Sequence, residues 1–179
     1  YFMKVIKVII GTALVIISLI GLFLLYSLYI NPKSPLDYAE YNEGDKKISI
    51  RYFRPYKNQR LIFGNLDEDP LIPYGSYWRL GANLTTKITI NRDLDFARRV
   101  LPRGSYGLYT YPYAENWVLY LHAKTGGYSF NEPDSEGVVM KINIPIKPID
   151  TIHEQFTIDF VESSIRMRWE NIEALIPIN

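Results

Sequence analysis

The stretch FTIDFVESSIRMRW, residues 156–169, decides the fold class of this chain. Apolar residues occupy every second position in its first half, at 156, 158 and 160, and again in its second half, at 165, 167 and 169. Side chains of a β-strand point alternately to two faces, so this period predicts two strands that each bury one face. The segment Glu162-Ser163-Ser164 between them is typical of a tight turn, which predicts a β-hairpin.

The same two-residue period recurs through the chain from residue 46 onward. It is found at residues 48–52, 88–90, 117–122 and 138–144. Turn-forming segments separate these runs, among them Pro102-Arg103-Gly104, Gly126-Gly127 and Pro133-Asp134. Many short strands with such turns predict an all-β domain, an antiparallel β-sandwich or jelly-roll-like fold over residues 46–179.

An uncharged apolar stretch, VIIGTALVIISLIGLFLLYSLYI, covers residues 8–30. As a helix it would be about 34 Å long, enough to cross a hydrocarbon core of about 30 Å. A cleaved signal peptide is the alternative, but its apolar part is shorter, about 7–15 residues, and it ends in a small-x-small cleavage site that is missing here. We therefore expect a retained transmembrane helix over 8–30, a short cytoplasmic segment over 1–7 and a linker over 31–45.

Charges flanking the apolar stretch predict its orientation. Lys4 and Lys7 precede it, whereas Lys33, Asp37 and Glu40 beyond it nearly balance. The positive-inside rule then places the N-terminus in the cytoplasm. The expected location is the bacterial cytoplasmic (inner) membrane, crossed once by residues 8–30, with the C-terminal domain periplasmic.

Composition argues against several functional classes. The chain has no cysteine, which excludes disulfides, a cysteine nucleophile and a lipid-bearing cysteine. Beyond residue 30 it is nearly neutral, which gives no electrostatic reason to expect nucleic acid as a partner. Its two histidines, His122 and His153, lie in no hydrolase or metalloprotease motif, and we interpret both as structural. We expect no enzyme, no cofactor and no metal, and interpret Asp67-Glu68-Asp69 and the Asp93/Asp95 pair as solvated turn residues.

One group of arginine and aromatic residues is the first candidate for a ligand site. Guanidinium groups beside aromatic faces can recognise a carboxylate or a sugar. Packing of the arginine stems on aromatic rings is the structural alternative, and we favour it. The candidate ligand-binding residues are Arg54, Tyr56, Tyr74, Trp78, Arg79 and Asn83.

Three consecutive segments resemble a known family. They are RPYKNQRLIFG at 54–64, LIPYGSYWRLGANLTTKITI at 71–90 and LPRGSYGLYTYP at 101–112. In this order they resemble the bacterial domain-of-unknown-function 2911 family (DUF2911). The resemblance implies a small envelope β-domain behind a signal sequence or an anchor. The segment HAKTGGYSFNEPDSEG, residues 122–137, departs from the expected pattern because it lacks a tryptophan.

Two functions remain open on the sequence alone. The first is a non-catalytic accessory subunit whose β-domain docks on a larger bacterial membrane protein complex, for which tyrosines along 106–113 would suit an interface. The second is a membrane-tethered module that binds a small molecule or carbohydrate through the arginine and aromatic group. Exposure of Trp78 and Arg79 in a concave pocket would favour the second function, and their burial would favour the first.

Overall fold

The computed structural model describes residues 2–26, 32–127 and 131–179. It contains two compact units, Tyr1–Pro35 and Leu36–Asn179, which are described separately. The first unit holds one helix, α1 (Phe2–Leu25), and the second holds the strands β1 to β11. The chain is therefore one β-rich domain preceded by one helix.

Helix α1 consists almost entirely of apolar residues. It is 24 residues long, about 36 Å at 1.5 Å per residue, and its length and composition suffice to cross a membrane. A signal sequence would have the same properties, so the helix indicates an anchor or a signal sequence. The transmembrane helix was predicted over residues 8–30, but α1 begins earlier, at Phe2. The last part of the predicted span, residues 27–30, lies outside the described residues.

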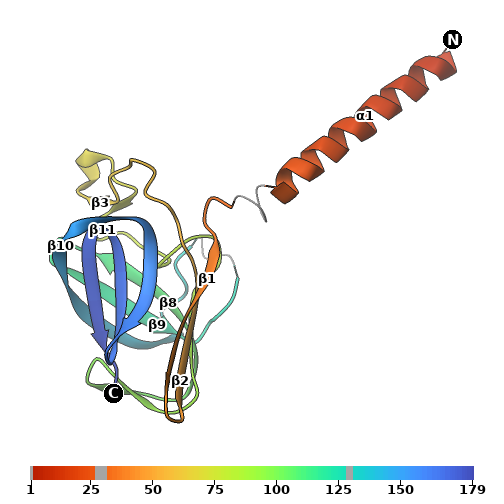
Figure 1. Cartoon of the computed structure of the whole chain (residues 1–179). Coiled ribbons are helices and arrows are strands. Elements are labelled where there is room, and N and C mark those ends of the chain that lie inside the picture. The colour runs from red at the N-terminus through yellow and green to blue at the C-terminus, as the bar shows by residue number, and fades with distance from the viewer. Residues whose placement is uncertain (1, 27–31, 128–130) are drawn as a thin grey trace. The chain divides into compact units, whose positions relative to one another are not determined.

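Seven strands of the domain form one antiparallel sheet (Figure 1). Their order is β1-β2-β5-β8-β9-β10-β11. Their bounds are Leu36–Glu43 for β1, Lys46–Phe53 for β2, Thr86–Ile90 for β5, Gly104–Pro112 for β8, Asn116–His122 for β9, Val138–Val161 for β10 and Ser164–Pro177 for β11. Two small pairs are added, β3 (Phe63–Gly64) with β4 (Ile72–Pro73) and β6 (Leu94–Phe96) with β7 (Arg99–Leu101), together with the short 3-10 helix η2 (Leu66–Glu68).

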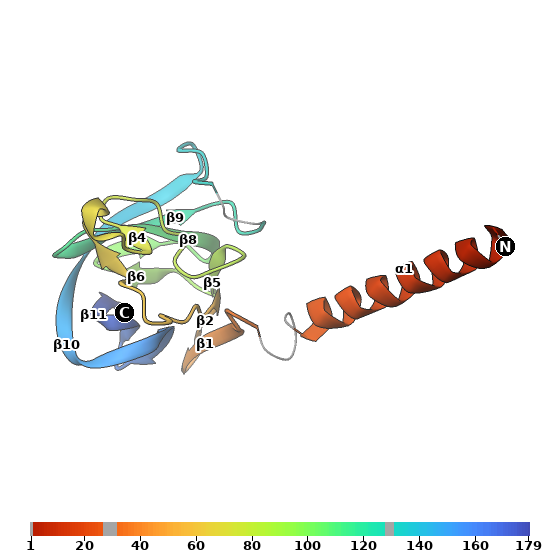
Figure 2. The same ribbon diagram turned by 90° about the horizontal axis from the view of Figure 1, so that it is seen from above.

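The long strand β10 curls the sheet into a half-barrel. Its first part, Val138–Pro145, pairs with β9, and the rest pairs with β11. Residues 149–152 form an arch that stands opposite the single residue Asn171, because Pro148 pairs with Ile172 and His153 with Glu170. Such a bulge bends a strand and increases its twist. Seen from above, β10 sweeps round so that β11 lies across from β5 and β8 (Figure 2).

The predicted antiparallel β-domain and its hairpin around Glu162 are confirmed. In place of the two face-to-face sheets of a sandwich or jelly roll, the described residues form one continuous main sheet that curls on itself. The predicted linker over residues 31–45 is wrong in its second part, because Leu36–Glu43 is strand β1. This strand lies at the sheet edge and exposes most of its side chains, so its polar composition resembles that of a linker.

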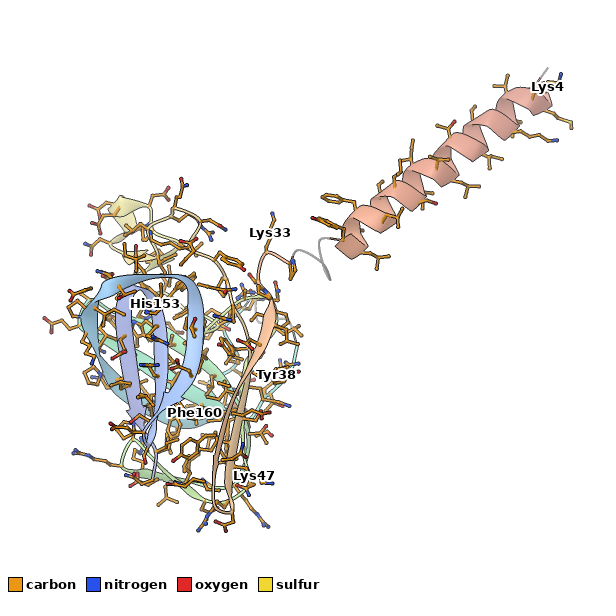
Figure 3. All side chains as sticks on the ribbon, in the orientation of Figure 1. Lys4, Lys33, Tyr38, Lys47, His153 and Phe160 are labelled. Carbon is orange, nitrogen blue, oxygen red and sulfur yellow. The ribbon has the colours of Figure 1, made fainter. Side chains whose placement is uncertain are left out.

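The side chain of Tyr52 helps to close the seam between the β1–β2 pair and β10. The hydroxyl of Tyr52 accepts a hydrogen bond from the Ile158 amide at 2.9 Å and donates one to the Ile158 carbonyl at 3.1 Å. Along this seam the two strands run in the same direction (Figure 3). Strand β1 leads from Tyr38 toward the hairpin near Lys47, and β10 runs the same way from His153 to Phe160. The Tyr52 hydroxyl therefore takes the place of the backbone groups of a neighbouring strand, which would otherwise pair with the Ile158 amide and carbonyl.

Aromatic side chains fill the middle of the half-barrel. Trp78, Trp117 and Trp169 are at most 5% exposed, and their ring centroids lie 5.4 Å (78–117) and 5.6 Å (78–169) apart. Phe63 and Phe156 complete the cluster, with ring centroids 5.5 Å and 5.0 Å from that of Trp78. All three tryptophans of the chain thus belong to the core.

Candidate functional site

Arg54, the first residue of the predicted ligand group, joins strands. Its guanidinium donates to the Phe156 carbonyl at 3.3 Å, to the Asp37 carboxylate at 3.1 Å and to the Thr157 hydroxyl at 2.9 Å. These contacts tie the end of β2 to β1 and β10. Neighbouring Tyr56 forms an isolated bridge with Gln155 on the same seam.

Trp78 is buried in the core, and its indole N–H donates to the Gly81 carbonyl at 3.2 Å. Arg79 is half-buried, and its guanidinium reaches the carbonyl of the exposed residue Asn83 at 3.5 Å. Tyr74 lines a separate groove near β10 and packs against the core. The six predicted residues are therefore distributed over the seam, the core, a surface loop and this groove, with no common pocket among the described cavities.

A pocket of about 270 Å³ opens on the outer face of β8 and β9. The alternation of these strands sends Leu108 and Leu119 into the core and directs Tyr109, Tyr120 and His122 outward. Tyr77 joins this outer face because its neighbour Trp78 bridges to Thr110 of β8, with both backbone bonds at 2.8 Å. Segments far apart in the sequence thus form one wall.

Four tyrosines pack together on this outer face, and we call them the tyrosine cluster: Tyr77, Tyr109, Tyr111 and Tyr120. Of these, Tyr77 and Tyr109 line the pocket. Tyr109 and Tyr120 are stacked with ring centroids 4.9 Å apart, and Tyr77 lies 5.5 Å from Tyr109. Tyr111 contacts Tyr120 edge-on at 5.6 Å. Such mutual packing holds the rings in place, so the wall is preorganised.

The described parts of the loop after β9 form the rim of the pocket, and His122 fixes them. Its Nε2 donates to the Asp134 carbonyl at 2.9 Å, because its Nδ1 accepts the Lys124 amide at 2.9 Å. The ring is 3% exposed and packs on Gly137, where a Cβ atom would overlap it. Gly107 is similarly required, because a Cβ atom there would overlap the Lys124 carbonyl. His122 therefore positions the rim.

Polar groups converge on the pocket from this rim. Lys124, Asn131 and Glu132 line it together with Tyr77 and Thr85. Burial and the nearby Glu132 carboxylate raise the pKa of Tyr109 to about 12. The pKa of Tyr111 is also raised, mainly by burial and to a lesser extent by a hydrogen bond to Glu132. The phenols of Tyr109 and Tyr111 are therefore neutral hydrogen-bonding groups at physiological pH. Beside them lie the Glu132 carboxylate, the Lys124 ammonium and the Asn131 carboxamide.

This arrangement can bind a small polar molecule that also has an apolar face. The described residues contain no group of three or more His, Asp or Glu suited to a metal ion. Sequence reasoning noted the tyrosines along 106–113 but did not place them at a pocket, and it missed Lys124, Asn131 and Glu132. The usable signal was the outward alternation of tyrosines on two consecutive strands.

Comparison with known proteins gives a single type of match. The model of the family described as "Protein of unknown function (DUF2911)" matches residues 34–178. No curated protein and no solved structure matches this chain. The matched region contains every residue of the pocket and all the strands of the β-domain.

Proposed function

Because this chain belongs to the DUF2911 family, whose description assigns no activity, we propose a function from its geometry. The protein is a membrane-anchored, non-catalytic binding module. Its β-domain holds a small, hydroxyl-rich molecule such as a single sugar unit in the pocket beside the tyrosine cluster. It acts by binding this ligand at the membrane surface.

The pocket itself carries this proposal. Its volume of about 270 Å³ is slightly below the range of about 300–1,000 Å³ that is typical of small-molecule sites, and so suits a ligand of one ring. Sugars present apolar C–H faces to aromatic rings and hydroxyls to amide, carboxylate and ammonium groups. Tyr77 and Tyr109 supply the aromatic wall, and Asn131, Glu132 and Lys124 supply the hydrogen-bonding groups.

The anchoring part of the proposal follows from the N-terminal sequence. Residues 8–30 contain no charge, and Lys4 and Lys7 precede them. We propose that the helix is retained as a single-pass anchor in the bacterial inner membrane, with the N-terminus in the cytoplasm and the β-domain in the periplasm. The bilayer is then the first partner of the chain, through residues 8–30.

A different observation favours a second function, that of a non-catalytic accessory subunit of a larger membrane protein complex. One end of the β-domain exposes several large apolar side chains, including Leu66 at 80% and Ile152 at 66%. Exposed apolar groups that lie together mark interaction surfaces. The two functions use different parts of the domain, so they are compatible.

Ligand binding can be tested on the full chain, labelled with 3-fluorotyrosine and held in detergent micelles. Glucose, galactose and N-acetylglucosamine are titrated while the ¹⁹F resonances of the tyrosine cluster are followed. We expect saturable shifts with at least one sugar. Tyr77→Ala and Glu132→Gln should weaken that binding at least about tenfold, or about 1.4 kcal/mol.

Glu115→Gln is the matched control, since Glu115 is exposed and lies outside the pocket. It should leave the affinity unchanged. The proposed ligand class is wrong if no sugar in the panel gives saturable shifts. The proposed site is wrong if binding occurs but Tyr77→Ala and Glu132→Gln leave it as strong as in the parent protein.

A further inference from the structure

A second concave surface lies at the end of the domain formed by β3, β4 and the arch of β10. This docking groove has a volume of about 450 Å³ and a mixed lining. Its apolar side chains include Leu61, Tyr74, Ile149, Ile152 and Ile172, and its polar ones are Asp150, Glu170 and Asn171. Leu61 is 39% exposed and Ile152 is 66% exposed. Next to Leu61, Leu71 is 42% exposed, its amide bonded to the Leu61 carbonyl at 2.9 Å. Leu61, Ile152 and Leu71 are therefore apolar side chains that the domain itself leaves partly uncovered.

The backbone at this groove is available for pairing. In the arch, residues 149–152 are extended and have no partner in the described strand register, because they stand opposite Asn171 alone. Unpaired strand backbone is a template for another extended chain. The groove therefore offers both apolar contacts and backbone hydrogen bonds, a combination that suits a peptide segment better than a lipid tail.

Charge around the groove has one predominant sign. Asp67, Asp69 and Asp150 are exposed and form no ion pair among the described residues. The cation Lys57 is already paired with Glu170 at 2.9 Å. Arg60, a second cation close to Lys57 in the sequence, donates to the Lys57 and Tyr56 carbonyls and keeps its charge, so the carboxylates of Asp67, Asp69, Asp150 and Glu170 still outnumber these two cations. The acidic rim disfavours an anionic lipid surface and is complementary to lysine or arginine.

Chain length limits where a partner can be. Residues 26–35, ten in number, separate the end of α1 from β1. A fully extended segment of ten residues spans at most about 33–36 Å. Within the domain, β1 begins at the same end as the arch and η2 (Figure 1). A retained anchor thus keeps the grooved end within reach of the membrane surface.

We infer that the docking groove binds an extended apolar segment, flanked by lysine or arginine, in the extracytoplasmic membrane-adjacent part of another membrane protein. This inference rests on the anchored accessory function proposed above and names the surface and the chemistry of its partner. The segment adds to the arch backbone, packs its apolar side chains on Leu61 and Leu71, and places its cations beside Asp150 and the η2 carboxylates.

Site-specific photo-crosslinking of the full chain in native membranes tests this inference. The photoreactive residue p-benzoylphenylalanine replaces Ile152 in one variant and Val100 in the control. Val100 is 73% exposed on β7, whose partner β6 pairs with the C-terminal residues at the opposite end of the domain. Crosslinked peptides are then identified by mass spectrometry.

We expect one discrete adduct at position 152 and none at position 100. The crosslinked peptide should be apolar, flanked by lysine or arginine, and adjacent to a membrane span of the partner. Asp150→Lys should reduce the yield at least about fivefold, whereas Asp95→Lys, at the opposite end beside the C-terminus, should not.

Other outcomes overturn the inference. An adduct with a second copy of this chain, with lipid alone or with an acidic segment would each assign the groove a different occupant, and no adduct at 152 would assign it none. Fractionation of the same membranes separates the two proposals. A chain released as a soluble protein refutes the anchor, whereas a chain that stays in the membrane without an adduct refutes only the docking groove.

Discussion

The Tyr52 hydroxyl at the seam of the half-barrel provides the sharpest test of this fold. Tyr52→Phe removes one oxygen atom and leaves the aromatic ring, which is 1% exposed, in place. The Ile158 amide and carbonyl would then both lose their buried partner at 2.9 and 3.1 Å. An unsatisfied buried polar group costs about 1–3 kcal/mol. We expect the free energy of unfolding to fall by about 2–4 kcal/mol.

Urea unfolding of the full chain in detergent micelles, followed by tryptophan fluorescence, measures this change, because all three tryptophans are buried in the β-domain. Tyr106→Phe is the matched control. It removes a single hydrogen bond, to the Pro102 carbonyl at 2.7 Å, in a partly buried place, and should cost about 1 kcal/mol. Hydrogen exchange at the Ile158 amide should accelerate in Tyr52→Phe alone.

Alkaline pH gives an independent check of the same residue. Burial raises the pKa of Tyr52 from 10 to about 12. The folded state therefore keeps this proton after the unfolded state has lost it, so stability is complete below pH 10 and is lost as pH rises toward 12. The difference corresponds to about 3 kcal/mol, and Tyr52→Phe should remove this part of the pH dependence. A loss under about 0.5 kcal/mol at pH 7 with an unchanged alkaline profile would refute the role of the hydroxyl.

Three further predictions address the β10–β11 hairpin, the core and the pocket rim. Two arginines hold the pKa of Asp159 below its usual range despite its burial, so Asp159→Asn should cost about 1–2 kcal/mol at pH 7. The stability difference between Asp159→Asn and the parent protein should shrink as pH falls through that lowered pKa. A difference at pH 2 as large as that at pH 7, measured by urea unfolding, would contradict this. Trp78→Ala should lower the free energy of unfolding by about 3–5 kcal/mol because it leaves a cavity in the core. An unchanged midpoint of thermal unfolding would argue against a core role for Trp78. Gly107→Ala should cost about 1–3 kcal/mol and displace the Lys124 carbonyl, while Gly126→Ala, with open space around it, should do neither; amide NMR shifts of the rim loop would show the difference.

Local patterns predicted much of this fold correctly. The alternation at 117–122 and 138–144 corresponds to strands β9 and β10, and the turn at Glu162 joins β10 to β11 as expected. These predictions succeed because a strand with one buried face must repeat every two residues. Strand β1 was missed because an edge strand buries little and so carries a weak pattern: of its eight residues, Ala39 alone is buried.

The candidate site was much harder to predict. Arg54 and Trp78 form a conspicuous group in the sequence, but the structure gives Arg54 to the seam and Trp78 to the core. The pocket instead brings Tyr77, Tyr109 and Glu132 together from separate segments. Which arginine or aromatic residue faces solvent depends on strand pairing across the whole sheet, and spacing along the chain carries no information on that.

The sequence by itself determined the apolar helix, the β-class of the domain and the positions of its main hairpins, because length, hydropathy and a two-residue period are local properties. Tertiary structure decided the curl of the sheet, the closure of its seam by Tyr52 and the composition of the pocket and the docking groove. The arch of β10 shows why: four residues standing opposite Asn171 turn the strand, and this offset exists only once β10 and β11 are paired.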